Sequence, residues 1–301
     1  MSDSISRTHI FTGHSGAVYS IDVDSNFIYS ASADKFVVRW DIKRGIQDKF
    51  AIKLPNTPYS IKLFNQDKYL AVGLSNGDLH FFDIEQKKEI RFYQQHSTGV
   101  FGIFENINFD QLVVSDAGGN ISVWDTSTFE LIIYLPFDCG KIRRITSSLD
   151  GGTLYLACQD GMIRSVDAIT FNELSQFTAH KDGVTSVTFL SEKVLLSGGK
   201  DAYLKLWDVT TNQVLQELPA HNFVIYDCLV LNEHRFVTAS RDKTIKMWDT
   251  DTLKVVERID IKKQGHKHSV NQLRRIDDSR FASCSDDGMV MVWQVIQSQT
   301  I

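Results

Sequence analysis

Three groups of histidine, serine and aspartate are the residues of this chain whose types could do chemistry. They are His14, Ser32 and Asp34; His221, Ser240 and Asp242; and His268, Ser285 and Asp287. A serine nucleophile, activated by a histidine that an aspartate orients, is the arrangement of many hydrolases. An active site needs this trio once, whereas the chain carries it three times. The recurrence indicates a structural role, and we predict no catalytic residue among them.

Other motifs also give no support for an enzyme. The sequence has no glycine-rich phosphate loop, no G-x-S-x-G and no H-E-x-x-H. The four cysteines, none of which has C-x-x-C spacing, are Cys139, Cys158, Cys228 and Cys284. We expect Cys158 to be a small buried side chain rather than a reactive thiol. The histidines of residues 266–268 could ligate a metal, but they have no evident acidic or cysteine partner. We therefore expect no metal, no cofactor and no small-molecule substrate.

Composition and charge favour a soluble globular protein. The 301 residues are 43% hydrophobic, which is enough apolar material for a large core. The 32 basic and 37 acidic residues give a net charge of −5, which argues against a surface built for nucleic acid or an anionic membrane. No run of apolar residues is long enough to span a bilayer, and the N-terminal sequence is unlike a signal peptide. We expect a cytoplasmic protein, or in a eukaryote alternatively a nuclear one.

The elements that must position these residues follow from an internal repeat. An aromatic or apolar residue that is followed by aspartate, or once by glutamine, recurs every 41 to 45 residues. The first members are Trp40, Phe82, Trp124, Val166, Trp207, Trp248 and Trp293. Segments of alternating apolar and polar residues around each pair predict four strands per unit. Four strands in about 42 residues fit a blade of a β-propeller, whereas a helical repeat would show a 3.6-residue period.

This pattern resembles the tryptophan-aspartate (WD) repeat family from residue 9 to about residue 296. The Gly-His marker of that family stands at Gly13-His14, and Ala179-His180, Ala220-His221 and Lys267-His268 occupy the same place in later units. The resemblance implies an all-β fold in which residues 1–301 form a single seven-bladed propeller of four-stranded antiparallel blades. Only three strands are available to unit 7, so we expect residues 7–12 to complete blade 7 and close the ring.

The resemblance also assigns the three repeated groups, because in WD repeats a histidine, a serine, an aspartate and the tryptophan form a hydrogen-bonded chain. The matching residues are His14, Ser32, Asp34 and Trp40; His221, Ser240, Asp242 and Trp248; and His268, Ser285, Asp287 and Trp293. We expect the aspartates in the turn between the second and third strands, where a carboxylate accepts turn N–H groups. Units 2 and 3 carry Asn76 and Gly118 in place of the turn aspartate, and unit 4 carries Cys158 in place of the serine. We expect these units to be less rigid or to be stabilised by other packing.

Two further sets of side chains are expected on one face of the ring, which is known in the family as the top face. The first set follows the first apolar residue of the first strand: Tyr19, Tyr59, Phe101, Arg143, Thr185, Tyr226 and Asn271. The second set precedes the turn position: Ala33, Ser75, Ala117, Gln159, Lys200, Arg241 and Asp286. Aromatic residues and arginine dominate the energetics of protein interfaces. The alternative is an ordinary mixed surface whose aromatic residues are half-covered by their neighbours.

From this face we predict a non-catalytic scaffold that binds a peptide or loop of a partner protein within a multiprotein complex. Positive charge in units 4 to 6 favours an acidic or phosphorylated segment. The predicted partner-binding residues are Tyr19, Tyr59, Phe101, Lys141, Arg143, Lys200, Tyr226 and Arg241. One alternative is an RNA-associated subunit, whose binding would weaken steeply with salt. Another is an unrecognised propeller enzyme, which would need perturbed carboxylates or a metal at the channel mouth.

Overall fold

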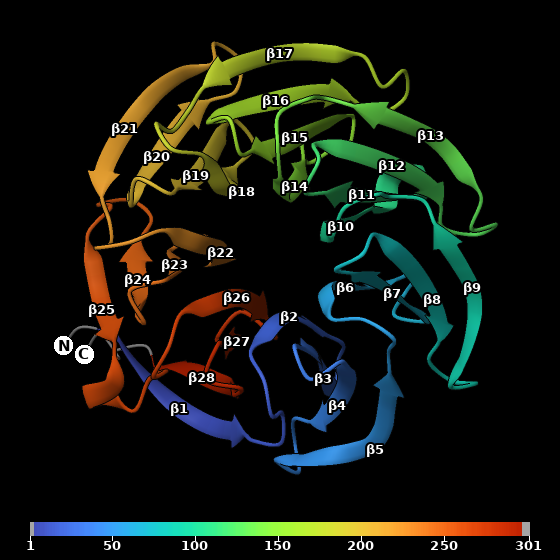
Figure 1. Cartoon of the computed structure of the whole chain (residues 1–301). Helices are drawn as coiled ribbons and strands as arrows, with labels where there is room; N and C mark the ends of the chain where they lie inside the picture. The colour runs from blue at the N-terminus through green and yellow to red at the C-terminus, as the bar shows by residue number, and fades with distance from the viewer. Residues whose placement is uncertain (1–2, 297–301) are drawn as a thin grey trace.

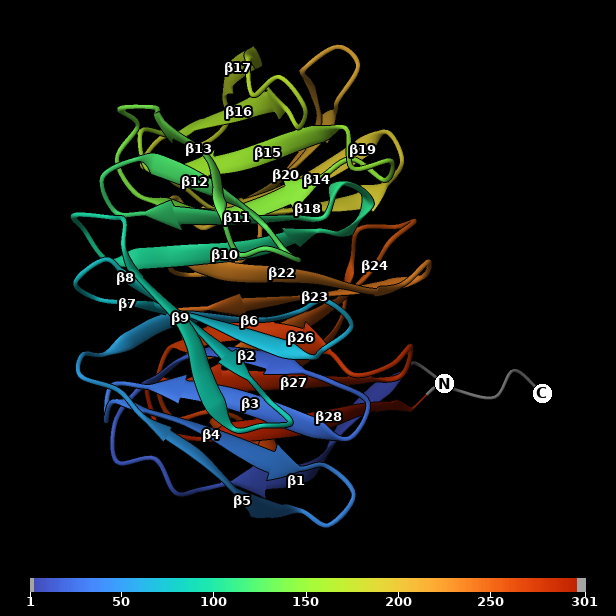
Figure 2. The ribbon, with the colours of Figure 1, turned by 90° about the vertical axis from the view of Figure 1, so that its right-hand side faces the viewer.

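The computed structural model describes residues 3–296 and shows seven four-stranded antiparallel sheets arranged as blades around a central channel (Figure 1). Seen from the side, the strands run between the two faces of the ring (Figure 2). The prediction of an all-β seven-bladed propeller is confirmed. We call the strands of a blade a, b, c and d from the channel outward.

Seven sets of strands make the blades, and their bounds are as follows. Blade 1 contains β2 (Val18–Val23), β3 (Phe27–Ser32), β4 (Phe36–Asp41) and β5 (Ile46–Lys53), and blade 2 contains β6 (Pro58–Phe64), β7 (Tyr69–Leu74), β8 (Asp78–Asp83) and β9 (Lys88–Gln94). Blade 3 contains β10 (Val100–Asn106), β11 (Gln111–Asp116), β12 (Asn120–Asp125) and β13 (Leu131–Pro136), and blade 4 contains β14 (Ile142–Ser147), β15 (Thr153–Cys158), β16 (Met162–Asp167) and β17 (Glu173–Thr178). Blade 5 contains β18 (Val184–Ser191), β19 (Val194–Gly199), β20 (Tyr203–Asp208) and β21 (Gln213–Pro219), and blade 6 contains β22 (Ile225–Asn232), β23 (Arg235–Ser240), β24 (Ile245–Asp249) and β25 (Val255–Ile259). Blade 7 contains β26 (Val270–Arg275), β27 (Arg280–Ser285), β28 (Val290–Ile296) and β1 (Ser4–Phe11), and two 3-10 turns, η1 (Ile107–Phe109) and η2 (Ile261–Lys263), lie in the connections.

The two faces of the ring carry different connections. The b–c turns meet the d–a connections on one face, as the hydrogen bond from Leu54 N to Lys35 O (2.9 Å) shows. The a–b turns meet the c–d turns on the other face, where Ile42 N donates to Asn26 O (3.0 Å). We call the first face the top face and the second the bottom face.

The apolar core lies between neighbouring blades. Alternation along a strand sends successive side chains to opposite faces of its sheet, so each blade buries one apolar face against the blade before it and the other against the blade after it. Val38 and Trp40 of blade 1, for example, pack with Val290 and Val292 of blade 7 in one buried cluster. Removal of apolar area from water stabilises the fold by about 25 cal/mol per Å². That gain requires neighbouring blades, because a single blade leaves both faces exposed.

The N-terminal strand closes the ring. Strand β1 pairs antiparallel with β28, from Ser4 opposite Ile296 to Phe11 opposite Val290. The predicted closure of blade 7 is thus confirmed, and the strand spans Ser4–Phe11 rather than residues 7–12. Phe11 also stacks on Trp40 at a ring-centroid distance of 5.3 Å, so the closing strand helps to form the core between blades 7 and 1.

Hydrogen-bonded chains from histidine to tryptophan are present, but the predicted serine of blade 1 was wrong. His14 bonds Asp34 through Nδ1 (2.8 Å) and Ser30 through Nε2 (2.8 Å), and Trp40 Nε1 donates to Ser30 Oγ (2.7 Å). Ser32 Oγ instead donates to Gly16 O (3.1 Å) and accepts from Asp34 N (3.3 Å). Both serines lie on the same side of β3, because they are two residues apart. Ser32 ends the strand at the turn, whereas Ser30 lies deeper, between the side-chain rings of His14 and Trp40.

The same correction applies to blade 6. His221 Nε2 bonds Thr238 Oγ1 (2.7 Å), to which Trp248 Nε1 also donates (2.9 Å). Ser240, the residue predicted for this place, donates to Phe223 O (3.2 Å).

In blade 7 both the predicted histidine and the predicted serine were wrong. His266 bonds Asp287 (3.0 Å) and Ser283 (2.8 Å), and Trp293 donates to Ser283 (2.8 Å). His268 is exposed, and Ser285 accepts from Asp287 N (3.2 Å). The reason is register: the network histidine lies four residues before the first residue of strand a, as His14 does before Val18, and His266 has this place before Val270.

Two blades carry networks that the sequence analysis did not assign. In blade 5, His180 joins Asp201 and Ser197, to which Trp207 donates. In blade 3, His96 bonds Asp116 (2.9 Å) and Ser122 (2.8 Å), and Trp124 donates to Ser122 (2.8 Å). Asp116 thus replaces the aspartate that is missing at Gly118, and blade 3 does not lack the network. Cys158 of blade 4 is fully buried, as predicted.

The turn aspartates have the predicted position. Each accepts a hydrogen bond from the N–H two residues further along the chain, as in Asp34 with Phe36 N (3.0 Å) and Asp160 with Met162 N (3.0 Å). The same bond is made by Asp201, Asp242 and Asp287.

Deletion of residues 1–12 is expected to open the ring. It leaves β28 as an unpaired edge strand and exposes the apolar side chains that Phe11 covers, so the truncated chain should aggregate. Size-exclusion chromatography and thermal unfolding measure this. A soluble truncated protein with an unchanged melting temperature would contradict the closure.

Replacement of the two serines of β3 distinguishes the observed network from the predicted one. Ser30→Ala leaves the buried Nε1 of Trp40 and Nε2 of His14 without their partner, which costs about 1–3 kcal/mol per stranded group. Ser32→Ala removes weaker, partly exposed bonds and should cost about 0.5–1.5 kcal/mol. Urea denaturation of both variants gives the two free energies, and a larger loss for Ser32→Ala would restore the original assignment.

Asp242→Ala is expected to lower stability in a pH-dependent way. Burial alone would raise the pKa of Asp242, but the hydrogen bond and charge of His221 outweigh burial, and the pKa lies below its ordinary value. The folded protein therefore binds fewer protons than the unfolded chain near pH 4, so this stabilisation is present above about pH 4 and is lost as pH falls further. The melting temperature of Asp242→Ala should be lower at pH 7, and its difference from the unmodified protein should shrink below about pH 4. Asp251→Ala, a change at an exposed residue on a c–d turn, is the control. If Asp242→Ala melted at the same temperature as the unmodified protein at pH 7, Asp242 would have no structural role.

Candidate partner-binding site

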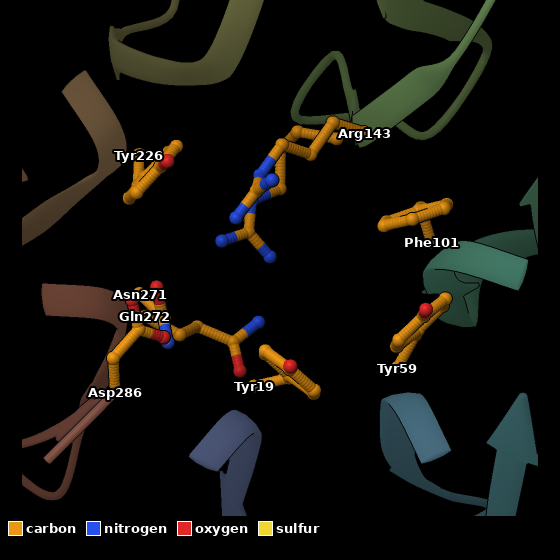
Figure 3. A pocket seen from close by; sticks show the side chains of 9 residues that line it. Tyr19, Tyr59, Phe101, Arg143, Tyr226, Asn271, Gln272 and Asp286 are labelled. Carbon is orange, nitrogen blue, oxygen red and sulfur yellow. The ribbon is translucent and has the colours of Figure 1, made fainter. Parts of the chain in front are cut away.

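Predicted first-strand side chains converge on a cavity at the top mouth of the channel (Figure 3). The cavity has a volume of about 260 Å³, and its walls are Tyr19, Tyr59, Phe101, Arg143, Arg144, Tyr226, Asn271, Gln272 and Asp286. The structure thus brings together five of the eight predicted partner-binding residues, from blades 1, 2, 3, 4 and 6.

A β-bulge in every strand a aims these side chains. In blade 1, pairing between β2 and β3 shifts between Val18 and Ser20, so Tyr19 has no partner in strand b. The equivalent shift occurs at the second residue of strand a in all seven blades. A bulge bends the strand and redirects the extra residue. In six blades that residue lines the mouth of the channel, as Tyr19, Tyr59, Phe101, Arg143, Tyr226 or Asn271.

Aromatic rings form a continuous arc over blades 1 to 3. Tyr19 meets Tyr59 edge-on at 5.5 Å between ring centroids, and Tyr59 stacks on Phe101 at 4.8 Å. All three side chains are half-buried. Burial, together with the charge of Asp286 and the neighbouring Tyr59, raises the pKa of Tyr19. The arc therefore offers neutral, largely apolar surface to whatever enters the cavity.

Cations flank the arc on the side of blade 4. Lys141 Nζ lies 3.6 Å from the centre of the Phe101 ring, and the Arg143 guanidinium lies 4.5 Å from that of Tyr226. Burial and the nearby charges of Arg143 and Lys200 lower the pKa of Lys141. Within residues 3–296, none of Lys141, Arg143 and Lys200 forms an ion pair with a carboxylate. Arg143 in the cavity wall, Lys141 beside Phe101 and Lys200 further out on the top face thus carry positive charge that the described part of the chain does not neutralise by direct pairing.

The remaining predicted residues lie elsewhere. Lys200 and Arg241 are exposed on the b–c turns of blades 5 and 6 and do not line the cavity. Thr185 occupies the bulge position of blade 5, but its hydroxyl is buried against the carbonyl oxygens of Gly198 and Ile225. These turns extend the top face outward from the cavity.

Sequence reasoning missed Arg144 and Gln272, which follow bulge residues. Strict alternation would turn them away from the channel, and the bulge cancels that alternation. Gln272 Oε1 accepts from Ser20 Oγ (3.0 Å) and Ile21 N (2.6 Å), which joins blades 7 and 1. Strand a of every blade has one residue more than its pairing with strand b requires, and this extra residue was the signal from which Arg144 and Gln272 could have been predicted.

A network of ion pairs forms the floor of the cavity, deeper in the channel. Arg144 of blade 4 pairs with Asp227 of blade 6 (2.6 Å), and Asp22 of blade 1 pairs with Lys62 of blade 2 (3.1 Å) and Arg274 of blade 7 (3.3 Å). These groups line a second cavity of about 240 Å³. Five innermost strands are therefore tied together directly beneath the aromatic arc.

No group of three or more histidine, cysteine, aspartate or glutamate side chains in residues 3–296 is placed to hold a metal ion. In the same range, no helix has the length and apolar character needed to cross a bilayer.

Comparison with known proteins agrees with the fold. A seven-bladed ring with histidine-to-tryptophan networks defines a repeat propeller of the WD type. The family model for the WD domain, G-beta repeat, matches residues 5–41, 171–208, 212–249 and 259–294. The chain is therefore a WD-repeat β-propeller.

Curated relatives are distant. Eukaryotic translation initiation factor 3 subunit I of Drosophila willistoni is 23% identical over 215 residues, which are 65% of this chain and 66% of that protein. Autophagy-related protein 16 of Arabidopsis thaliana is 26% identical over 138 residues, or 45% of this chain and 26% of that protein. Mitochondrial division protein 1 of Vanderwaltozyma polyspora is 27% identical over 129 residues, which are 36% of this chain and 18% of that protein. The chain spans slightly less than two thirds of the first of these relatives. Fold and relatives together support a protein-interaction scaffold.

Proposed function

We propose that the top-face cavity binds an extended or loop segment of a partner protein, with an acidic or phosphorylated residue beside an apolar anchor. The observation that carries this proposal is the guanidinium of Arg143, which faces the cavity without an ion-pair partner in residues 3–296. A carboxylate or phosphate can accept two parallel hydrogen bonds from such a group. The arc of Tyr19, Tyr59 and Phe101 on the opposite wall gives the apolar anchor its contact surface.

The geometry favours a segment rather than a folded surface. A cavity of about 260 Å³ receives one or two side chains, and five of the six innermost strands that line it are fixed to one another by the floor network. The remainder of the segment would lie across the b–c turns that carry Lys200 and Arg241. Preformed walls reduce the ordering cost of binding, so a short segment can bind with useful affinity.

A place in a multiprotein complex is part of the proposal. Several relatives are named as subunits of translation initiation factor 3, and a propeller of this kind would hold such an assembly together through its partner segments. We accordingly propose a cytoplasmic, translation-related scaffold. Direct RNA binding is less well supported, because few cations face the cavity and the chain carries net negative charge.

Charge reversal at the two arginines tests the proposal. The probes are arrayed extended peptides with a leucine or phenylalanine next to glutamate or phosphoserine, measured by fluorescence anisotropy. Arg143→Glu with Arg241→Glu should weaken the best peptide at least tenfold, because the change replaces attraction by repulsion. The melting temperature should stay the same.

Arg91→Glu with Arg44→Glu makes the same charge change at exposed positions away from the top face and should leave peptide binding unaltered. Equal affinity in the folded Arg143 and Arg241 double variant would move the site to another face. A steep salt dependence with single-stranded RNA, together with no peptide binding, would favour the RNA-associated alternative.

A further inference from the structure

The bottom face of blades 3 and 4 carries the most exposed apolar side chains of the described residues. Ile107 is 74% exposed, Leu149 69% and Ile169 66%, which are the highest values among large hydrophobic residues in this range. Ile107 begins η1 in the a–b turn of blade 3, Leu149 lies in the a–b turn of blade 4, and Ile169 lies in the c–d turn of blade 4. We call these three residues the lower patch. Exposed apolar groups that gather in one place commonly mark an interaction surface.

Hydrogen bonds hold the three turns together. Asn108 Nδ2 donates to Leu149 O (3.2 Å), and the buried Asn106 donates through Nδ2 to Gly151 O (2.9 Å). Within blade 4, Ala168 N donates to Gly152 O (2.9 Å). The backbone beneath the lower patch is thus connected across two blades.

Gly151 makes the close approach between the blades possible. It has a φ of +75°, and a Cβ there would lie 2.6 Å from Asn106 Oδ1. Glycine adopts this conformation without strain and leaves room for the asparagine. The lower patch is therefore a fixed surface built by specific residues.

Carboxylates surround the lower patch without basic neighbours in sequence. The four bottom turns of blades 3 and 4, with the strand residues that flank them, are residues 105–110, 125–130, 147–152 and 167–172, and they contain no lysine or arginine. Glu105, in β10, accepts a hydrogen bond from Asn65 N of blade 2 (2.7 Å), and burial raises its pKa. The other acidic residues are Asp110, Asp125, Glu130, Asp150 and Asp167, and within residues 3–296 none of these five forms an ion pair with a lysine or arginine. Backbone hydrogen bonds, from Thr128 and Thr170 respectively, lower the pKa of Asp125 and Asp167.

We propose that the lower patch docks a basic amphipathic segment of a partner protein. Its apolar side chains cover Ile107, Leu149 and Ile169, and its lysine or arginine side chains face the surrounding carboxylates. Complementary charge steers such a partner and disfavours acidic ones. An anionic membrane surface is repelled by the same carboxylates.

A second copy of this chain would fit the lower patch less well than a basic segment does. A two-fold dimer would place the lower patch of one copy on that of the other and so bring carboxylates opposite carboxylates. This docking is independent of the top-face proposal, because the two surfaces lie on opposite faces of the ring. One propeller could therefore hold an acidic and a basic segment together.

The first experiment uses a designed probe. It is an 18-residue peptide of leucine and lysine with helical spacing, compared with a scrambled peptide and with a leucine and glutamate version, by fluorescence anisotropy. We expect the basic amphipathic peptide to bind best and to weaken as salt is raised. A photo-crosslinker on the peptide should label residues 105–110 and 147–152. Equal binding of the glutamate peptide, or labelling confined to another face, would overturn the proposal.

Variants locate the site. Ile107→Ser with Leu149→Ser, and separately Asp110→Asn with Glu130→Lys, should each weaken the peptide at least tenfold with unchanged melting. Val214→Ser with Leu215→Ser, on exposed positions of outer strand β21, is the matched apolar control and should have no effect. The top-face change Arg143→Glu with Arg241→Glu should also leave this peptide's affinity intact. Unaltered affinity in both patch variants would contradict the proposal. Self-association of the unmodified protein would also contradict it, if the double variant Ile107→Ser with Leu149→Ser abolished that self-association.

Discussion

Burial between blades is the constraint on which this structure depends. Each large apolar cluster joins strands of two neighbouring blades, so no blade completes a core by itself. An open row of blades would leave one apolar face bare at each end, and that cost disappears only when the last blade meets the first. Strand β1 makes this possible, because it places the start of the chain in blade 7 and Phe11 in the core against blade 1.

The same constraint positions the candidate site. In blade 1 the network histidine, the first residue of strand a and the bulge residue are His14, Val18 and Tyr19. The histidine fixes the incoming loop to the b–c turn, the valine is buried between blades, and the bulge turns the tyrosine into the channel. Six bulge positions around the ring thus supply side chains to one cavity without any irregular insertion. What the cavity can bind depends on which residues occupy these positions.

The sequence was sufficient for the fold, because a period of about 42 residues with four alternating segments admits few other architectures. It also placed seven of the nine cavity residues on the top face, five of them as partner-binding residues, since equivalent places in a ring face the same axis. Ser30 was missed because Ser30 and Ser32 lie on one side of the same strand, and periodicity cannot decide which is deeper. His266 was missed because the longer connection before blade 7 offers two histidines, and only the distance to strand a separates them.

Arg144, Gln272 and Asp116 show a different limit. A bulge shifts the alternation by one residue, so a strictly alternating pattern assigns Arg144 and Gln272 to the wrong side of the strand. Asp116 compensates for Gly118 from a neighbouring position, a substitution that only the path of the side chains shows. Sequence reasoning succeeds where the repeats are equivalent and fails where one blade builds the same network from residues at other positions.

The net charge of −5 conceals an uneven distribution that matters for how the propeller works. Positive side chains that form no ion pair within residues 3–296 gather on the top face, whereas the bottom turns of blades 3 and 4 carry only acidic charges. A strand of six residues separates the faces by about 20 Å, which exceeds the screening length of about 8 Å at physiological ionic strength. The two charged surfaces therefore do not cancel each other in water, and each favours contact with groups of the opposite sign. Because the inter-blade core holds both surfaces on one closed ring, the fold sets the distance between the two proposed sites.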